Sequence, residues 1–158
     1  MKTIAWFQAL AVLLAVASRA GAAERGTPAE ARAMLQKAVA RYGSVGRQQA
    51  LADFTARKAP FVDRDLYVFC LGPDATIVAN GGFPGLVGTS ADAVKDAEGK
   101  GVGKAMWEVG SGKGSGSVEY RWLNPVTNKP EPKIAFVQKV GEDVCAVGAY
   151  NAPRSDAR

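Results

Sequence analysis

The last third of the chain, residues 116–150, constrains the fold most, because its pattern predicts three strands joined by two turns. Apolar side chains alternate with polar ones at Val118, Tyr120 and Trp122, which is the period of a half-buried strand. An Asn-Pro pair and then a Lys-Pro pair follow, and both end this strand, because proline fixes φ and removes a ladder donor.

The rest of this segment continues the same pattern. A second apolar run extends from Ile134 to Val140 and meets the short turn Gly141-Glu142-Asp143. A third run, Val144 to Tyr150, follows the turn. The segment therefore predicts a three-stranded antiparallel meander.

The first 22 residues have the pattern of an export signal. Lys2 supplies a positive start, and residues 3–17 form an apolar run about as long as a signal-peptide core. Arg19 interrupts the run before the roughly 20 apolar residues that a membrane span needs. Small residues at 20–23 offer cleavage sites in two frames. We expect a signal peptide over residues 1–22, a periplasmic or secreted mature protein, and no stable membrane insertion after cleavage.

Composition limits the mature chain to one domain. About 135 residues follow the leader, which is enough for one hydrophobic core but not for two. The formal net charge of +5 includes Lys2 and Arg19, and it falls to +3 when these two leave with the leader. The other basic residues are spread along the chain, which is typical of a solvated surface. Nucleic-acid binding is therefore not expected.

The chain contains no histidine, which excludes Ser–His and Cys–His nucleophile systems and most zinc sites. Its Gly-Lys pairs lack the upstream glycine that a phosphate-binding loop requires. Asp92, Asp96 and Glu98 lack the oxygen-ligand spacing of a calcium loop, and we expect Asp96 or Glu98 to cap a helix instead. We therefore expect no enzyme, no cofactor and no metal site.

Before the meander, the pattern predicts helices and a hairpin. Thr27-Pro28-Ala29-Glu30 is a capping box with proline at the first helical position, and it predicts a helix that ends at Gly43. A second helix is expected at Gln48–Arg57, and a third around Val102–Val109. Between them, the two strands of a hairpin are expected at Asp65–Leu71 and Thr76–Asn80. Together with the meander they predict a single α+β domain.

Cys70 and Cys145 each lie in a predicted strand. In an oxidising compartment such a pair can form a disulfide. Two free cysteines that pack as small buried hydrophobic residues are the alternative. The spacing does not decide between them, and it does not form the CxxC motif of a redox site.

The order of these elements resembles a single Cache domain of the second type, an extracytoplasmic relative of the PAS sensor fold. The resemblance covers about 120 residues and implies an antiparallel five-stranded sheet with N-terminal helices, in one domain at residues 27–151. It also implies an exported module that binds a small organic molecule, as in chemoreceptors. The segments that carry it are DLYVF (65–69), LVG (86–88), KDAEGK (95–100), GSVEYRWLNPVT (116–127), PKIAFVQKV (132–140) and VGAY (147–150).

The chain departs from this family at two positions. Such domains often have Ala-His after the second strand, where this chain has Ala79-Asn80. They commonly have Lys-x-x-Tyr in the penultimate strand, where this chain has Lys133 followed by Phe136. Both departures make the expected pocket less polar.

The meander also supplies the candidate ligand-binding residues. Tyr120 and Trp122 point to one face of their strand, and each offers an apolar surface with one polar group. Lys133 opens the next strand and supplies a compact cation. A short carboxylate is expected to pair with Lys133, accept hydrogen bonds from the two aromatics and rest on Phe136.

Two other interpretations remain open from the sequence. Tyr67, Trp107, Tyr120 and Trp122 could enclose an amine by cation–π attraction, although Lys133 would repel it. The aromatics could instead be core, with the lysine reaching solvent. The domain would then be a structural or interaction module without a ligand. The residues after 150 predict no signalling element, so any signal would pass to a separate membrane protein.

Overall fold

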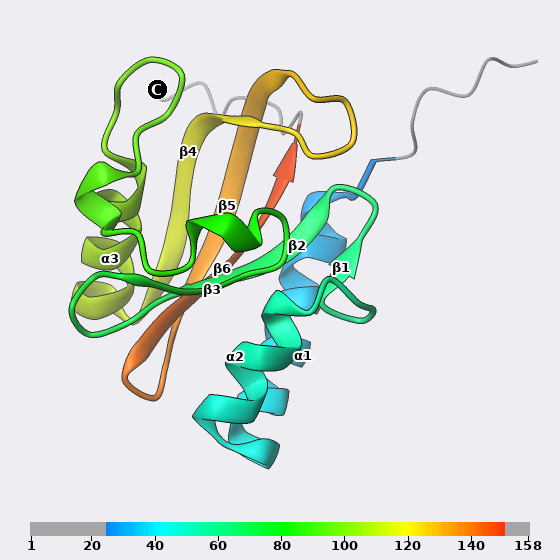
Figure 1. Cartoon of the computed structure of the whole chain (residues 1–158), viewed down its shortest axis with the longest axis vertical. Helices are drawn as coiled ribbons and strands as arrows, with labels where there is room; N and C mark the ends of the chain where they lie inside the picture. The colour runs from blue at the N-terminus through cyan, green and yellow to red at the C-terminus, as the bar shows by residue number, and fades with distance from the viewer. Residues whose placement is uncertain (1–24, 151–158) are drawn as a thin grey trace, which may run out of the picture.

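The computed structural model describes residues 25–150 as helices packed on the two faces of an antiparallel sheet (Figure 1). The predicted signal peptide and residue 151 lie outside this range. Helices α1 (Pro28–Val45) and α2 (Arg47–Thr55) cover one face, and α3 (Val102–Lys113) covers the other with two short 3-10 turns, η1 (Pro84–Leu86) and η2 (Ala91–Ala93). No helix in this range is long and apolar enough to cross a membrane.

The sheet contains six strands in the order β1-β2-β6-β5-β4, with β3 also paired to β2. All pairs are antiparallel, and the predicted meander is confirmed as β4, β5 and β6. The predicted five strands are present, and β1 is an additional two-residue strand. The strands are β1 (Val62–Asp63), β2 (Leu66–Leu71), β3 (Ile77–Asn80), β4 (Ser115–Leu123), β5 (Pro130–Val140) and β6 (Asp143–Tyr150).

Strand β5 begins four residues before the predicted start at Ile134. Pro132 lies opposite Arg121, whose N–H points away from β5 and donates to Asp96 Oδ2 at 3.4 Å. The pair is therefore a non-hydrogen-bonded one, where proline removes no bond between β4 and β5. This extension places Lys133 inside a strand.

The capping box of α1 is present as predicted, with Thr27 and Glu30 each accepting a hydrogen bond from the other's backbone N–H. The helix does not end at Gly43. It continues to Val45 and ends before Gly46, which has a φ of 81°. A glycine inside a helix weakens it without stopping it, whereas a positive φ requires the chain to leave the helix.

Cys70 and Cys145 form a disulfide. The two residues lie directly opposite each other in the β2–β6 ladder, in the core between the sheet and helices α1 and α2. The sequence left this bond open, because only the strand order brings β2 next to β6. The disulfide ties the first long strand of the sheet to the last.

Candidate functional site

Three residues of the candidate site form a row across the sheet. Tyr120 of β4 lies opposite Lys133 of β5, and Lys133 lies opposite Tyr150 of β6. Residues that lie directly opposite in an antiparallel ladder project to the same face. The three side chains therefore project together toward the face that α3 covers.

Lys133 is buried, with 2 % of its surface exposed. Its Nζ lies 3.9 Å from the centroid of the Tyr67 ring and 4.4 Å from that of Tyr150, and it donates to the Tyr150 hydroxyl at 3.2 Å. The pKa of Lys133 is lowered well below 10.5 because burial penalises the ammonium, and the nearby Asp65 carboxylate only partly offsets this. The amino group of this lysine is thus enclosed by two tyrosine rings.

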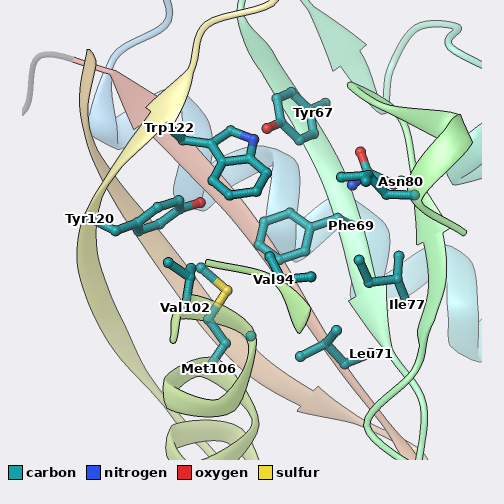
Figure 2. Close-up of a pocket in the computed structure, with 12 residues that line it drawn as sticks. Tyr67, Phe69, Leu71, Ile77, Asn80, Val94, Val102, Met106, Tyr120 and Trp122 are labelled. Carbon is teal, nitrogen blue, oxygen red and sulfur yellow. The ribbon is translucent and has the colours of Figure 1, made fainter. Parts of the chain in front are cut away.

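The two tyrosines are linked through their hydroxyl groups. The Tyr150 hydroxyl donates to the carbonyl of Leu123 at 2.7 Å, so the Tyr67 hydroxyl, 3.4 Å away, is the donor between the two tyrosines. The indole N–H of Trp122 is directed toward the Tyr67 hydroxyl (Figure 2). Burial raises the pKa of Tyr67 well above 10 and also raises that of Tyr150, so both phenols stay protonated.

Beside this cluster is a cavity of about 30 Å³ between the sheet, α3 and the loops around η1 and η2 (Figure 2). Most of its wall is apolar. Tyr67, Tyr120 and Trp122 line one end, together with Asn80 at the end of β3. The remaining wall consists of Phe69, Leu71, Ile77, Leu86, Val94, Val102, Gly103 and Met106.

Two polar groups in the wall of this cavity have no partner among residues 25–150. The Tyr120 hydroxyl makes no hydrogen bond, and burial raises its pKa well above 10. Asn80 accepts at Oδ1 from the N–H groups of Gly82 at 3.1 Å and Phe83 at 2.8 Å, which leaves its Nδ2 without an acceptor. A hydroxyl and an amide N–H are therefore available to a molecule in the cavity.

The glycine-rich connection after β3 shapes the same end of the cavity. A β-carbon at Gly82 would lie 2.6 Å from ring atoms of Tyr67. Only glycine lets the backbone lie this close to the ring, and the turn is held by the Asn80 amide oxygen. Asn80, which stands where relatives often have histidine, thus has both a structural bond and a free donor.

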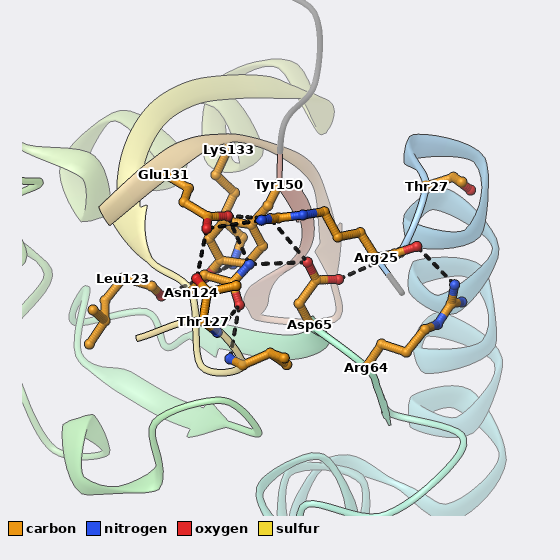
Figure 3. A network of polar contacts seen from close by, with 12 residues as sticks. Arg25, Thr27, Arg64, Asp65, Leu123, Asn124, Thr127, Glu131, Lys133 and Tyr150 are labelled. Carbon is orange, nitrogen blue, oxygen red and sulfur yellow. Dashed lines mark hydrogen bonds and ion pairs between the residues drawn. The ribbon is translucent and has the colours of Figure 1, made fainter. Parts of the chain in front are cut away.

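A polar cluster lies on the far side of Lys133 (Figure 3). Glu131 forms an ion pair with Arg25 and accepts from Thr127 Oγ1 at 2.7 Å and Asn124 Nδ2 at 3.0 Å. The buried Asp65 accepts from the backbone N–H of Gly26 at 2.7 Å and from Asn124 Nδ2 at 3.2 Å. These bonds attach the segment before α1 to the ends of β2 and β5.

The structure brings together four of the six predicted site residues. Tyr67, Tyr120 and Trp122 line the cavity, and Lys133 lies behind Tyr67 without lining it. Trp107 packs at the edge of the apolar cluster beside α3 and does not line the cavity.

The expected contact between the ligand and Phe136 requires correction. Phe136 is three residues after Lys133, and side chains on a strand alternate between faces, so the two project to opposite sides of the sheet. Phe136 belongs to the core beneath α1, where the Arg32 guanidinium carbon lies 3.7 Å from its ring centroid.

Tyr150, Phe69 and Met106 were not predicted for this site. Tyr150 could have been found from its strand register, because an in-register hairpin turn at residues 141–142 places it opposite Lys133. Phe69 shares its strand face with Tyr67, which period-two alternation also predicts. Met106 gave no such signal, because its place depends on how α3 packs on the sheet.

Within residues 25–150, no group of histidine, cysteine or carboxylate side chains is arranged to hold a metal ion. The polar atoms of the cavity are an amide, hydroxyl groups and an indole N–H. Such a set can offer hydrogen bonds and apolar contact to a small organic molecule.

Comparisons with known proteins show which fold the chain shares. The chain is similar in structure to a methyl-accepting chemotaxis protein from Vibrio parahaemolyticus, with a TM-score of 0.62, 20% identity, and coverage of 77% of this chain and 86% of the other. A periplasmic sensor domain of a chemotaxis protein matches with a TM-score of 0.60 and 25% identity, over 77% of this chain and 88% of that domain.

A third similar structure is a Cache chemosensory domain described for carboxylic acid recognition, with a TM-score of 0.60, 25% identity, and coverage of 77% and 86%. No curated protein gives a significant sequence match. The model of the family "Single Cache domain 2" matches residues 20–150, which is most of the chain. The chain therefore belongs to the single Cache domain 2 family, whose fold is that of extracytoplasmic sensor domains.

Proposed function

We propose that this domain is an exported sensory module that binds a short organic carboxylate in the cavity beside Tyr67, Tyr120 and Trp122. The observation that carries the proposal is the pair of free donors, the Tyr120 hydroxyl and the Asn80 amide, in an otherwise apolar wall. A carboxylate only accepts hydrogen bonds, so such donors suit it. No carboxylate side chain lines the cavity to repel it.

Lys133 supports an anion without lining the cavity. Its ammonium lies 3.9 Å from one face of the Tyr67 ring, and Tyr67 is itself part of the cavity wall. A bound carboxylate would favour the protonated form of this lysine through the low-dielectric interior. Binding is therefore expected to raise the pKa of Lys133.

The volume of the cavity limits the ligand to a small one. About 30 Å³ holds roughly two water molecules, so an acid of two or three carbons fits with a modest outward shift of the wall. The similar Cache domain described for carboxylic acid recognition supports this ligand class. The apolar end of the acid would rest on Phe69 and Met106 instead of Phe136.

An amine is a weaker candidate for the same site. The cation–π positions on Tyr67 and Tyr150 are already taken by Lys133. A cationic ligand beside it would be repelled by the protonated form of the lysine across the ring. A domain that has kept the fold without a ligand is the remaining alternative, and the small volume of the cavity favours it.

Calorimetric titration with acetate, propionate, propionamide and methylammonium tests the proposal. We expect the two acids to bind and the neutral amide, a near match in shape to propionate, to bind at least about tenfold more weakly. Tyr120→Phe should weaken propionate binding, whereas Trp107→Phe, an aromatic outside the cavity, should not. Equal binding of propionate and propionamide would contradict the carboxylate preference. Binding of none of the four would support the module without a ligand.

A further inference from the structure

Strand β4 is at the edge of the sheet (Figure 1). The loop after η2 covers the second half, where Lys100 Nζ donates to the Glu119 carbonyl at 2.8 Å and Arg121 N–H donates to Asp96. The first half, Ser115 to Ser117, is exposed and has neither proline nor a charged side chain. Proline and charged side chains are common means by which proteins keep a sheet edge from pairing with another strand, and this part of the edge has neither.

The backbone of this open half has groups directed outward. The N–H of Arg121 and the C=O of Glu119 both point away from β5. In an antiparallel pair this outward orientation recurs at every second residue. Ser117 and Ser115 therefore also direct their N–H and C=O groups outward. No other segment within residues 25–150 pairs with them.

Beside this edge lies a cation with a fixed position. The guanidinium of Arg32, on α1, stacks on the buried Phe136 ring with a separation of 3.7 Å. Within the described part of the chain, Arg32 has no hydrogen bond or ion pair. Stacking holds the guanidinium plane and leaves its N–H edges free for bidentate pairing with a carboxylate.

Arg32 and the open edge line the same groove, which has a volume of about 420 Å³. Leu35 and Phe136 contribute buried apolar surface, and Gln36 and Gln138 add neutral polar groups. The residues that line the groove include one cation and no carboxylate. The groove thus combines a free strand edge, an apolar floor and an unneutralised positive charge.

We propose that this groove docks an extended acidic segment of a partner protein, which adds as a strand to Ser115–Ser117 and pairs an Asp or Glu side chain with Arg32. Alternate side chains of an added strand face the helix side of the sheet, where Arg32 lies. Main-chain bonds to the edge supply affinity, and Arg32 selects the acidic residue. The site is on the opposite face of the sheet from the ligand cavity and is independent of it.

The chemistry of the groove favours a different protein over a second copy of this chain. In a symmetric pair, the open half of β4 would meet the same Ser-Gly-Ser segment of the other copy. That segment has no acidic residue, so both Arg32 side chains would stay unneutralised. A partner protein with an acidic side chain would neutralise the charge of Arg32.

Selection of random linear peptides against the protein expressed from its full-length sequence tests the proposal. We expect the enriched peptides to share an Asp or Glu within a stretch of β-forming residues. A synthetic peptide of this set should shift the amide resonances of Ser115 and Ser117. Its affinity should fall about tenfold or more in Arg32→Gln, and equally when its acidic residue is changed to the amide.

Two further variants separate the edge from the charge. Ser117→Pro removes one outward N–H and leaves the pairing with β5 intact, because proline is tolerated at such an edge position, and it should also weaken the peptide. Lys37→Gln, a cation of the same helix outside the groove, should not. No enrichment, enrichment without acidic residues, or equal binding by Arg32→Gln would overturn the proposal. Dimerisation that Ser117→Pro abolishes would overturn it too, by assigning the edge to a second copy.

Discussion

The side chain of Lys133 crosses strand β6 directly above Gly148, where a β-carbon would lie 2.1 Å from Lys133 Cε and 3.0 Å from Cδ. Gly148 lies opposite Ala135, two pairs along the ladder from Lys133 and Tyr150 and on the same face of the sheet. The missing side chain at Gly148 provides the path along which the lysine reaches the Tyr67 ring. The position of the buried ammonium therefore depends on a glycine in the neighbouring strand.

We expect Gly148→Ala to destabilise the domain by about 1–3 kcal/mol, because the new methyl group forces Lys133 out of its path. Urea denaturation measures the change. In a Lys133→Ala background the same substitution should cost much less, and the double-mutant cycle gives the coupling. Gly43→Ala is the matched control, since no atom lies within 4 Å of its β-carbon and it should stabilise α1 by up to about 1 kcal/mol. Additive effects of Gly148→Ala and Lys133→Ala would show that the two positions are not coupled.

The low pKa of Lys133 predicts how stability depends on pH. Because its folded-state pKa is below 10.5, the unfolded chain binds the additional proton between the two values. The free energy of unfolding therefore gains a contribution that rises with pH across this window. Lys133→Met lacks the titrating group, so the stability of the wild type relative to this variant should increase as the pH is raised toward 10.5. Urea denaturation over a pH series measures both curves. Parallel curves would mean that the pKa of the lysine is not lowered.

Local patterns in the sequence were sufficient for the elements of the fold. The capping box at Thr27 located the start of α1, and alternation at Val118 and Tyr120 located β4, because both signals depend on neighbouring residues. The sequence could not show whether Cys70 and Cys145 form a disulfide, because the bond requires β2 to lie beside β6, and these two strands are far apart in the sequence. The sequence-based resemblance to Cache domains agrees with the family match over residues 20–150.

Residues of the candidate site could be predicted only where alternation along a single strand determines the face on which a side chain lies. Tyr120 and Trp122 followed from alternation, whereas Phe136 was assigned to the cavity although its position three residues after Lys133 puts it on the other face. The enclosure of Lys133 could not be predicted, because it depends on the longer β5, on Gly148 and on Tyr67 from another strand. Such contacts form from three strands at once, and no single segment encodes them.

Removal of the disulfide should lower stability substantially. Cys70 and Cys145 are 75 residues apart, and the entropy of closing a loop of this length corresponds to about 4 kcal/mol. We expect the double variant Cys70→Ala/Cys145→Ala to unfold at a much lower urea concentration than the oxidised wild type. The reduced wild type should resemble the variant, which separates loss of the bond from loss of the sulfur atoms in the core. Equal stability of oxidised and reduced protein would contradict this prediction.

The ion pair between Arg25 and Glu131 predicts a loss of stability in acid. The hydrogen bond and charge of Arg25, opposed by burial, lower the pKa of Glu131 from 4.5 to about 2. A carboxyl group with a lowered folded-state pKa stabilises the fold above its unfolded value, and this contribution disappears as the pH falls through the folded value. Glu131→Gln should therefore cost up to about 3 kcal/mol near neutral pH, and the difference from wild type should shrink between about pH 4.5 and pH 2.

The control for this effect is Glu108→Gln, on an exposed part of α3 and without an ion-pair partner among the described residues. It should change stability little at any pH. Amide hydrogen exchange adds a local measurement, because Gly26 N–H donates to Asp65 within the same cluster and should lose protection in Glu131→Gln but not in the control. If Glu131→Gln were as stable as the wild type near neutral pH and kept Gly26 protected, the Arg25–Glu131 pair would not hold the segment before α1 against the sheet.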